Sequence, residues 1–155
     1  MRRLTSSLAL VLVVGNHLAA QSQASSDLWA GTRHLVLSKS TFRDGPAPKE
    51  RTFVIETVDN GIRATVTGTE SDGRPLNFSY TAKFDGKYYP ITGPSAGADS
   101  TSFRRVTARR FESRSKTKGK VVYTMMFALS KDGRVVTLTE TLPRGKRGNV
   151  LVYEK

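Results

Sequence analysis

Few residues of this sequence have the types and spacing that catalysis requires. His34 is the one histidine beyond residue 24, and Asp27 or Asp44 could orient it as a general base. Its nucleophile would be Ser38 or Ser40, but no glycine-framed turn surrounds either serine. The sequence has no cysteine, no cluster of metal-ligating residues and no glycine-rich phosphate loop. We therefore expect a protein that is not an enzyme and that uses no metal and no cofactor.

Anion binding is the chemistry that the charges favour. The sequence contains 25 Lys and Arg against 13 Asp and Glu, which gives a net charge of +12. Eight of these bases lie between Arg104 and Lys120, with Glu112 as the single acid among them. Every second side chain of an extended strand shares a face, so this segment predicts a positive stripe on a hairpin. Its candidate anion-binding residues are Arg110, Arg114, Lys116 and Lys118.

Two interpretations of the basic stripe remain open. An anionic polymer or an anionic membrane surface would be attracted to it, with a strong dependence on salt. Specific nucleic-acid binding is not expected, because no aromatic residues alternate with the charges to stack on bases. A basic face that only keeps the protein soluble and discourages sheet-to-sheet pairing explains the charges equally well.

A third feature is a set of apolar rows that contain two charged residues in phase. Aromatic and aliphatic residues recur at every second position in several segments, as in strands with one buried face. If these segments close into a barrel, its inner surface could hold one small ligand. Arg105 shares the phase of Phe103, and Glu140 shares that of Leu138. The candidate lining residues are Phe78, Tyr80, Phe84, Phe103, Arg105, Tyr123, Met125, Phe127 and Glu140.

Charged residues inside a barrel must be paired with each other or with a ligand. We predict that Arg105, helped by the hydroxyl group of Tyr80, binds the acidic headgroup of a small amphipathic ligand. The alternative is a β-bulge near Thr107, which would turn Arg105 toward solvent.

The elements that must position these residues are all strands. Period-two alternation is interrupted by Asn-Gly, Asp-Gly and similar pairs about every dozen residues, which is typical of hairpins in a meander. A closed, single antiparallel up-and-down β-barrel of about eight to ten strands is the simplest all-β fold, because closure leaves no exposed edge. A sandwich is the alternative. The predicted strands span 51–58, 61–68, 75–84, 101–107, 109–117, 121–130, 134–142 and 149–154, with weaker ones at 32–37 and 88–92.

The sequence resembles a family of exported, mostly uncharacterised bacterial proteins with a lipocalin-like, calycin-type barrel. The matching stretches are residues 31–32 (GT), 39–42 (KSTF), 45–48 (GPAP), 80–93 (YTAKFDGKYYPITG), 130–133 (SKDG) and 150–155 (VLVYEK). The resemblance implies the fold but no known activity. The family usually carries Gly-x-Trp at the first strand, whereas here Gly31-Thr32 is followed by Arg33 and the only tryptophan is Trp29.

The displaced tryptophan has two interpretations. It could close one end of the barrel in place of the usual tryptophan, with Arg144 or Arg147 as a cation–π partner. It could also be an ordinary apolar residue.

The first 24 residues predict a secretory signal peptide. Arg2 and Arg3 precede a short apolar run at 8–14, and Ala20 or Ala24 offers a cleavage point. The run is too short to span a bilayer, so we expect residues 25–155 to be a single secreted or periplasmic domain without a transmembrane segment. Two functions follow as hypotheses: a barrel that holds a small apolar or amphipathic acidic ligand, or a non-catalytic protein that docks on an anionic surface through its basic hairpin.

Overall fold

Ten antiparallel strands and two short 3-10 turns make up the computed structural model, which describes residues 28–94 and 97–155. The predicted signal peptide lies outside the described residues. Among the residues described, no helix is long and apolar enough to cross a membrane. The strands are β1 (Gly31–Leu35), β2 (Glu50–Val58), β3 (Gly61–Thr69), β4 (Pro75–Lys83), β5 (Tyr88–Thr92), β6 (Ser100–Thr107), β7 (Arg110–Thr117), β8 (Lys120–Leu129), β9 (Val135–Thr141) and β10 (Arg147–Glu154).

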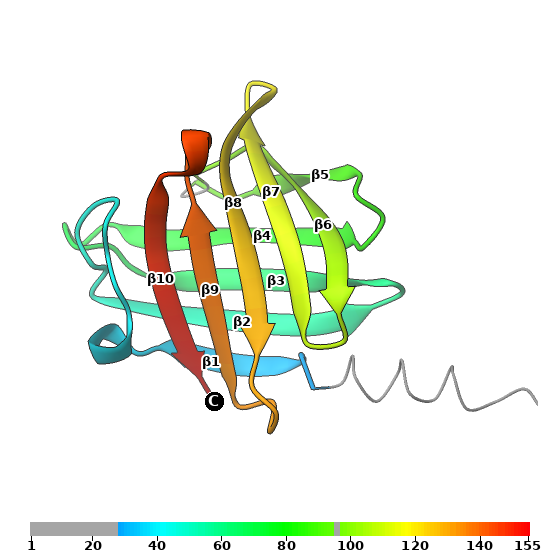
Figure 1. Ribbon diagram of the computed structural model, residues 1–155. Coiled ribbons are helices and arrows are strands. Elements are labelled where there is room, and N and C mark those ends of the chain that lie inside the picture. The colour runs from blue at the N-terminus through cyan, green and yellow to red at the C-terminus, as the bar shows by residue number, and fades with distance from the viewer. Residues whose placement is uncertain (1–27, 95–96) are drawn as a thin grey trace, which may run out of the picture.

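The strands close into an up-and-down barrel in which each pairs with its neighbours in sequence. β1 completes the circle, because it pairs with β2 on one side and with β10 on the other. The two segments with weaker patterns, 32–37 and 88–92, are β1 and β5, and both belong to the closed sheet. Figure 1 shows β6 to β10 standing steeply across β2, β3 and β4, which form the opposite wall. The predicted fold class is therefore confirmed.

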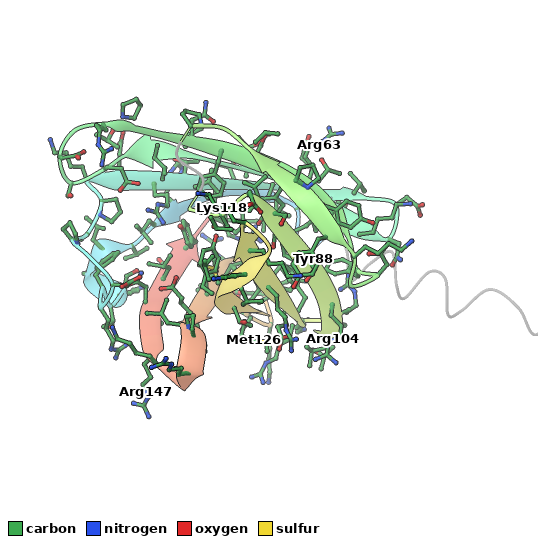
Figure 2. All side chains as sticks on the ribbon, turned by 90° about the horizontal axis from the view of Figure 1, so that it is seen from above. Arg63, Tyr88, Arg104, Lys118, Met126 and Arg147 are labelled. Atoms are coloured by element: carbon green, nitrogen blue, oxygen red, sulfur yellow. The ribbon has the colours of Figure 1, made fainter. Side chains whose placement is uncertain are left out.

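The alternation of the sequence explains which side chains face inward. In β3, Ile62, Ala64 and Val66 are buried, while Arg63 between them is exposed. Arg63, Arg104 and Arg147 all point away from the barrel (Figure 2). The tight turns depend on positive φ: Lys118 and Gly119 have φ values of 51° and 76°, as a type I′ hairpin turn requires.

One end of the barrel is packed solid by aromatic rings. Trp29 is 1% exposed and lies 4.5 Å from Phe111, measured between ring centroids, and its indole nitrogen donates to the Ala108 carbonyl at 3.0 Å. Phe111 stacks in turn on Phe127 at 4.4 Å. Trp29 therefore closes this end, as the first interpretation predicted.

The expected cation–π partner of Trp29 was wrong. The cation–π contacts of the described residues involve neither Arg144 nor Arg147. Both arginines lie at the start of β10 or just before it, whereas Trp29 precedes β1, at the opposite end of the barrel (Figure 1). The arginine beside Trp29 is Arg33, whose guanidinium donates to the Trp29 carbonyl oxygen at 2.8 Å.

Candidate ligand-binding site inside the barrel

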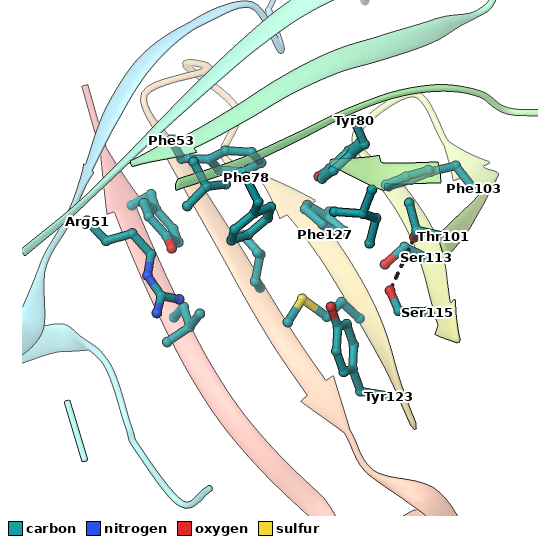
Figure 3. A pocket seen from close by; sticks show the side chains of 16 residues that line it. Arg51, Phe53, Phe78, Tyr80, Thr101, Phe103, Ser113, Ser115, Tyr123 and Phe127 are labelled. Atoms are coloured by element: carbon teal, nitrogen blue, oxygen red, sulfur yellow. Dashed lines mark hydrogen bonds between the residues drawn. The ribbon is translucent and has the colours of Figure 1, made fainter. Parts of the chain in front are cut away.

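A cavity of about 70 Å³ lies inside the barrel and is bordered by Phe103 and Phe127, whose rings also contact Phe111, the neighbour of Trp29. The cavity exists because β6, β7 and β8 contribute small or polar side chains here, namely Thr101, Ser113, Ser115 and Tyr123. Toward Trp29, aromatic rings fill the barrel instead. Figure 3 shows the side chains around this space, with Arg51 on one side and Ser115 and Tyr123 on the other. The lining residues are Arg51, Phe53, Val66, Phe78, Tyr80, Ile91, Thr101, Phe103, Ser113, Ser115, Tyr123, Met125, Phe127, Leu138, Leu151 and Tyr153.

The polar wall of the cavity comes from paired positions on neighbouring strands. Thr101 faces Ser115 across β6 and β7, and Ser115 faces Tyr123 across β7 and β8. The Ser115 hydroxyl donates to Thr101 Oγ1 at 3.3 Å. Serine at 113 and 115 leaves open the volume that a larger inward residue would fill.

The tyrosines of the cavity are held in the neutral form. Burial raises the pKa of the Tyr80 hydroxyl, and the neighbouring Tyr123 and Tyr153 hydroxyls raise it further. Burial also raises the pKa of Tyr123, against the opposing effect of a hydrogen bond with Ser115. These phenols are therefore hydrogen-bond donors at neutral pH, so they could bind an anion or a carbonyl oxygen.

Among the described residues that line the cavity, Arg51 is the single charged one. It follows Glu50 at the start of β2 and shares the inward phase of Phe53 and Ile55. Its Nε atom is buried without a hydrogen-bond partner among the described residues, and its Nη2 atom lies 3.8 Å from Oε1 of Glu70. The sequence could have indicated Arg51, because it has the same phase as Phe53 in a predicted strand.

A second hollow of about 310 Å³ adjoins the cavity at the mouth of the barrel. Arg51 and Leu151 line both spaces, so they form the boundary between them. The outer hollow is bordered by the segment before β2 and by the β3–β4 turn. Its other lining residues are Phe42, Asp44, Gly45, Pro46, Pro48, Glu70, Ser71, Asp72, Arg74 and Asn149.

Six of the nine predicted lining residues surround the cavity: Phe78, Tyr80, Phe103, Tyr123, Met125 and Phe127. The other three, Phe84, Arg105 and Glu140, do not. Arg105 is exposed, and its Cζ atom lies 4.0 Å from the centroid of the Phe84 ring. The register between β6 and β7 shifts between Arg105 and Thr107, where the alternative placed a bulge, but Arg105 itself still pairs with the buried Phe111 and keeps the phase of Phe103. Its contact with Phe84, which packs against Phe111, places Arg105 at the Trp29 end of the barrel, so the predicted position beside a ligand and Tyr80 is wrong.

Glu140 is buried, as its phase predicted, but it neither pairs with Arg105 nor lines the cavity. Its Oε2 atom accepts a hydrogen bond of 2.8 Å from the backbone amide of Asn149. Gly148 makes room for this carboxylate, because a Cβ at that position would lie 2.5 Å from Oε2. The pairing of Glu140 is thus completed within β9 and β10.

The predicted anion-binding residues lie on the outer face of the β6–β7–β8 region. Arg110, Arg114 and Lys118 are exposed, and Arg114 Nε lies 3.1 Å from Oε1 of Glu112. Lys116 is half-buried, with its Nζ atom 3.7 Å above the ring of Tyr88.

The predicted catalytic alternative has little support in the geometry. The His34 ring is hydrogen-bonded at 3.2 Å to the Thr52 hydroxyl, and Ser40 donates its own hydroxyl to the Val36 carbonyl. Asp27 lies outside the described residues. Within the described ranges, no group of three or more His, Asp or Glu side chains could hold a metal ion.

The sequence matches no protein-family model and no curated protein. Among solved structures, the chain is similar to a redesigned β-barrel, mFAP1, bound to DFHBI. The two share 16% sequence identity with a TM-score of 0.48, over 84% of this chain and 98% of that chain. A likeness of this size says nothing about what this chain binds, and the family suggested by the sequence motifs stays a prediction.

Proposed function

We propose that this protein is an exported, non-catalytic barrel that holds a small apolar or amphipathic ligand. The observation that carries the proposal is the internal cavity of about 70 Å³ that adjoins a larger hollow at the barrel mouth. Most side chains around the inner space are apolar or aromatic, whereas most around the outer hollow are polar or charged, which is the order an amphipathic molecule requires. The signal-like first 24 residues support a secreted or periplasmic location.

The size of the cavity limits the ligand. An engineered apolar cavity of about 150 Å³ binds benzene, so a space of half that volume takes only a narrow apolar group. The remainder of the ligand would lie in the outer hollow. A short amphipathic molecule fits this division better than a bulky polycyclic one.

Native mass spectrometry of the protein, purified without detergent, tests the proposal. A reproducible excess mass that is lost on denaturation would support it and would deliver the ligand for identification. If the bare polypeptide mass is observed and no short amphipathic molecule binds when added, the barrel is not a ligand carrier.

A second function is favoured by the basic outer face. Arg110 and Lys118 form no ion pair with any described residue, so their charges are available to a partner. Anionic lipid vesicles or an anionic polymer would be bound through this face, with affinity that falls as salt rises. Glu112 would compete with an anionic partner, because its carboxylate already contacts Arg104 and Arg114.

Cosedimentation with phosphatidylglycerol vesicles tests this second function. Arg110→Glu combined with Lys118→Glu should abolish binding at low salt, whereas Arg63→Glu combined with Lys83→Glu, which changes the net charge equally on β3 and β4, should not. Equal effects of the two changes would show that net charge alone drives the association.

A further inference from the structure

Arg51 is a cation without a complete set of partners. A guanidinium has five N–H donors, and the Nε of this one is buried with no acceptor among the described residues. Its ion pair with Glu70 is long, at 3.8 Å, and the side chains of Arg51 and Glu70 are 20% and 31% exposed. The guanidinium is therefore partly desolvated but only weakly neutralised, which favours the approach of a further anion.

The titratable groups that face Arg51 from inside the barrel include the neutral phenols of Tyr153 and Tyr123. Burial raises the pKa of Tyr153, whereas the charge of Arg51 and a hydrogen bond from Arg51 lower it. The two side chains are therefore in contact. Burial raises the pKa of Tyr123, the negative charge of Glu140 raises it further, and the positive charge of Arg51 lowers it. Glu140, which could have neutralised this charge, lies outside the lining and is engaged with the Asn149 amide.

We propose that Arg51 binds the carboxylate group of a short amphipathic acid, whose apolar tail enters the cavity beside Met125 and Phe127. This inference rests on the proposed ligand-binding function of the barrel. Arg51 lines both the cavity and the outer hollow, so a carboxylate beside it leaves the tail free to extend inward. Glu70 is the competitor, because its carboxylate must release the guanidinium when the ligand binds.

Two adjacent methionines provide an internal reporter and its control. Met125 lines the cavity, whereas Met126 pairs with Glu112 and Thr139 and lies on the outer face (Figure 2). With ¹³C-methyl methionine labelling, hexanoate and 1-hexanol are titrated into the protein and both methyl signals are followed. Binding in the cavity shifts the Met125 signal and leaves the Met126 signal in place.

We expect hexanoate to bind about tenfold more tightly than 1-hexanol, because a charge-assisted hydrogen bond is added to the same apolar contact. Arg51→Gln should remove this preference, because it weakens hexanoate binding far more than 1-hexanol binding. Glu70→Gln should strengthen hexanoate binding several-fold, because the competing carboxylate is gone. Glu70→Gln serves as the second variant, since it leaves Arg51 in place and its effect has the opposite sign.

The outcomes separate this inference from the function on which it rests. If both probes shift Met125 with equal affinity, and neither variant changes this, the barrel binds ligands but Arg51 does not select acids. If neither probe shifts Met125 in the unmodified protein, the proposed ligand-binding function itself is overturned. Weaker hexanoate binding in Glu70→Gln would contradict the competition between the two carboxylates.

Discussion

Arg33 and Trp29 are joined by a 2.8 Å hydrogen bond from Nη1 to the tryptophan carbonyl, and Arg33 is fully buried. Its Nη2 atom also donates to the carbonyls of Leu28 and Gly133, at 3.1 and 2.8 Å. One side chain thus ties the segment before β1 to the turn between β8 and β9. Arg33 occupies the position of the tryptophan in the Gly-x-Trp pattern of the family that the sequence resembles. Here Trp29, four residues earlier, closes this end of the barrel, and Arg33 holds it through the hydrogen bond to its carbonyl.

Replacing Arg33 by methionine should destabilise the protein by about 3 kcal/mol, because two buried carbonyls and a partly buried one lose their donor. Urea unfolding followed by tryptophan fluorescence measures the change. Arg134→Met is the control, since Arg134 is exposed and should cost less than about 0.5 kcal/mol. Equal losses in both variants would mean that the Arg33 hydrogen bonds contribute nothing specific.

Filling the cavity should abolish ligand binding without unfolding the barrel. Ser113→Leu places an isobutyl group into the space beside Met125, and its stability should stay within about 2 kcal/mol of the original because burial and crowding oppose each other. Thr139→Leu adds the same group on the exposed outer face. Loss of the Met125 shift with 1-hexanol in the first variant only would locate binding in the cavity; retention in both would place it elsewhere.

The raised pKa of Tyr80 predicts that the folded protein loses stability in alkali. Burial raises this pKa in the folded protein, so the folded state keeps a proton that the unfolded state releases. The stabilisation is complete below the unfolded pKa of about 10 and declines as pH rises above it. Thermal unfolding between pH 8 and pH 11 should show a smaller fall in Tm for Tyr80→Phe than for the original. The same fall in both would assign the alkaline loss to other groups.

Acid should act on the hairpin turns. The pKa of Asp85 is lowered by a hydrogen bond from the Lys87 amide and by another from the Tyr89 hydroxyl. The pKa of Asp132 is likewise lowered, by hydrogen bonds from the Ser130 hydroxyl and the Arg134 amide. A lowered pKa stabilises the fold above the unfolded value of about 4, and this is lost as pH falls through the folded value.

We therefore expect Tm to decrease below about pH 4, and to decrease less in Asp85→Asn, which cannot be protonated. Circular dichroism melts across this range measure the effect. Glu56→Gln, at an exposed position on β2, is the matched control. A Tm that is flat to pH 2.5 would contradict a role for these turn carboxylates.

The sequence by itself determined the fold class and nearly every strand. Alternation of apolar and polar residues is a local property of each segment, and positive-φ turn residues such as Gly119 mark where a segment must reverse. Closure followed because ten sequential hairpin strands leave two edges that can pair only with each other. Because alternation also shows which side chains face inward, six cavity-lining residues were identified from their phase alone.

Only the tertiary structure decided which inward residues fill the barrel and which leave a space. Phase cannot distinguish Phe111, which packs beneath Trp29, from Ser113 and Ser115, which border the cavity, because that depends on what the opposite wall contributes. Arg105 pairs with the inward Phe111 but lies beside Phe84 at the Trp29 end of the barrel, outside the lining, whereas Arg51 lies at the start of β2, beside the cavity. The charge inside the barrel is thus set by where strands meet, which no single strand encodes.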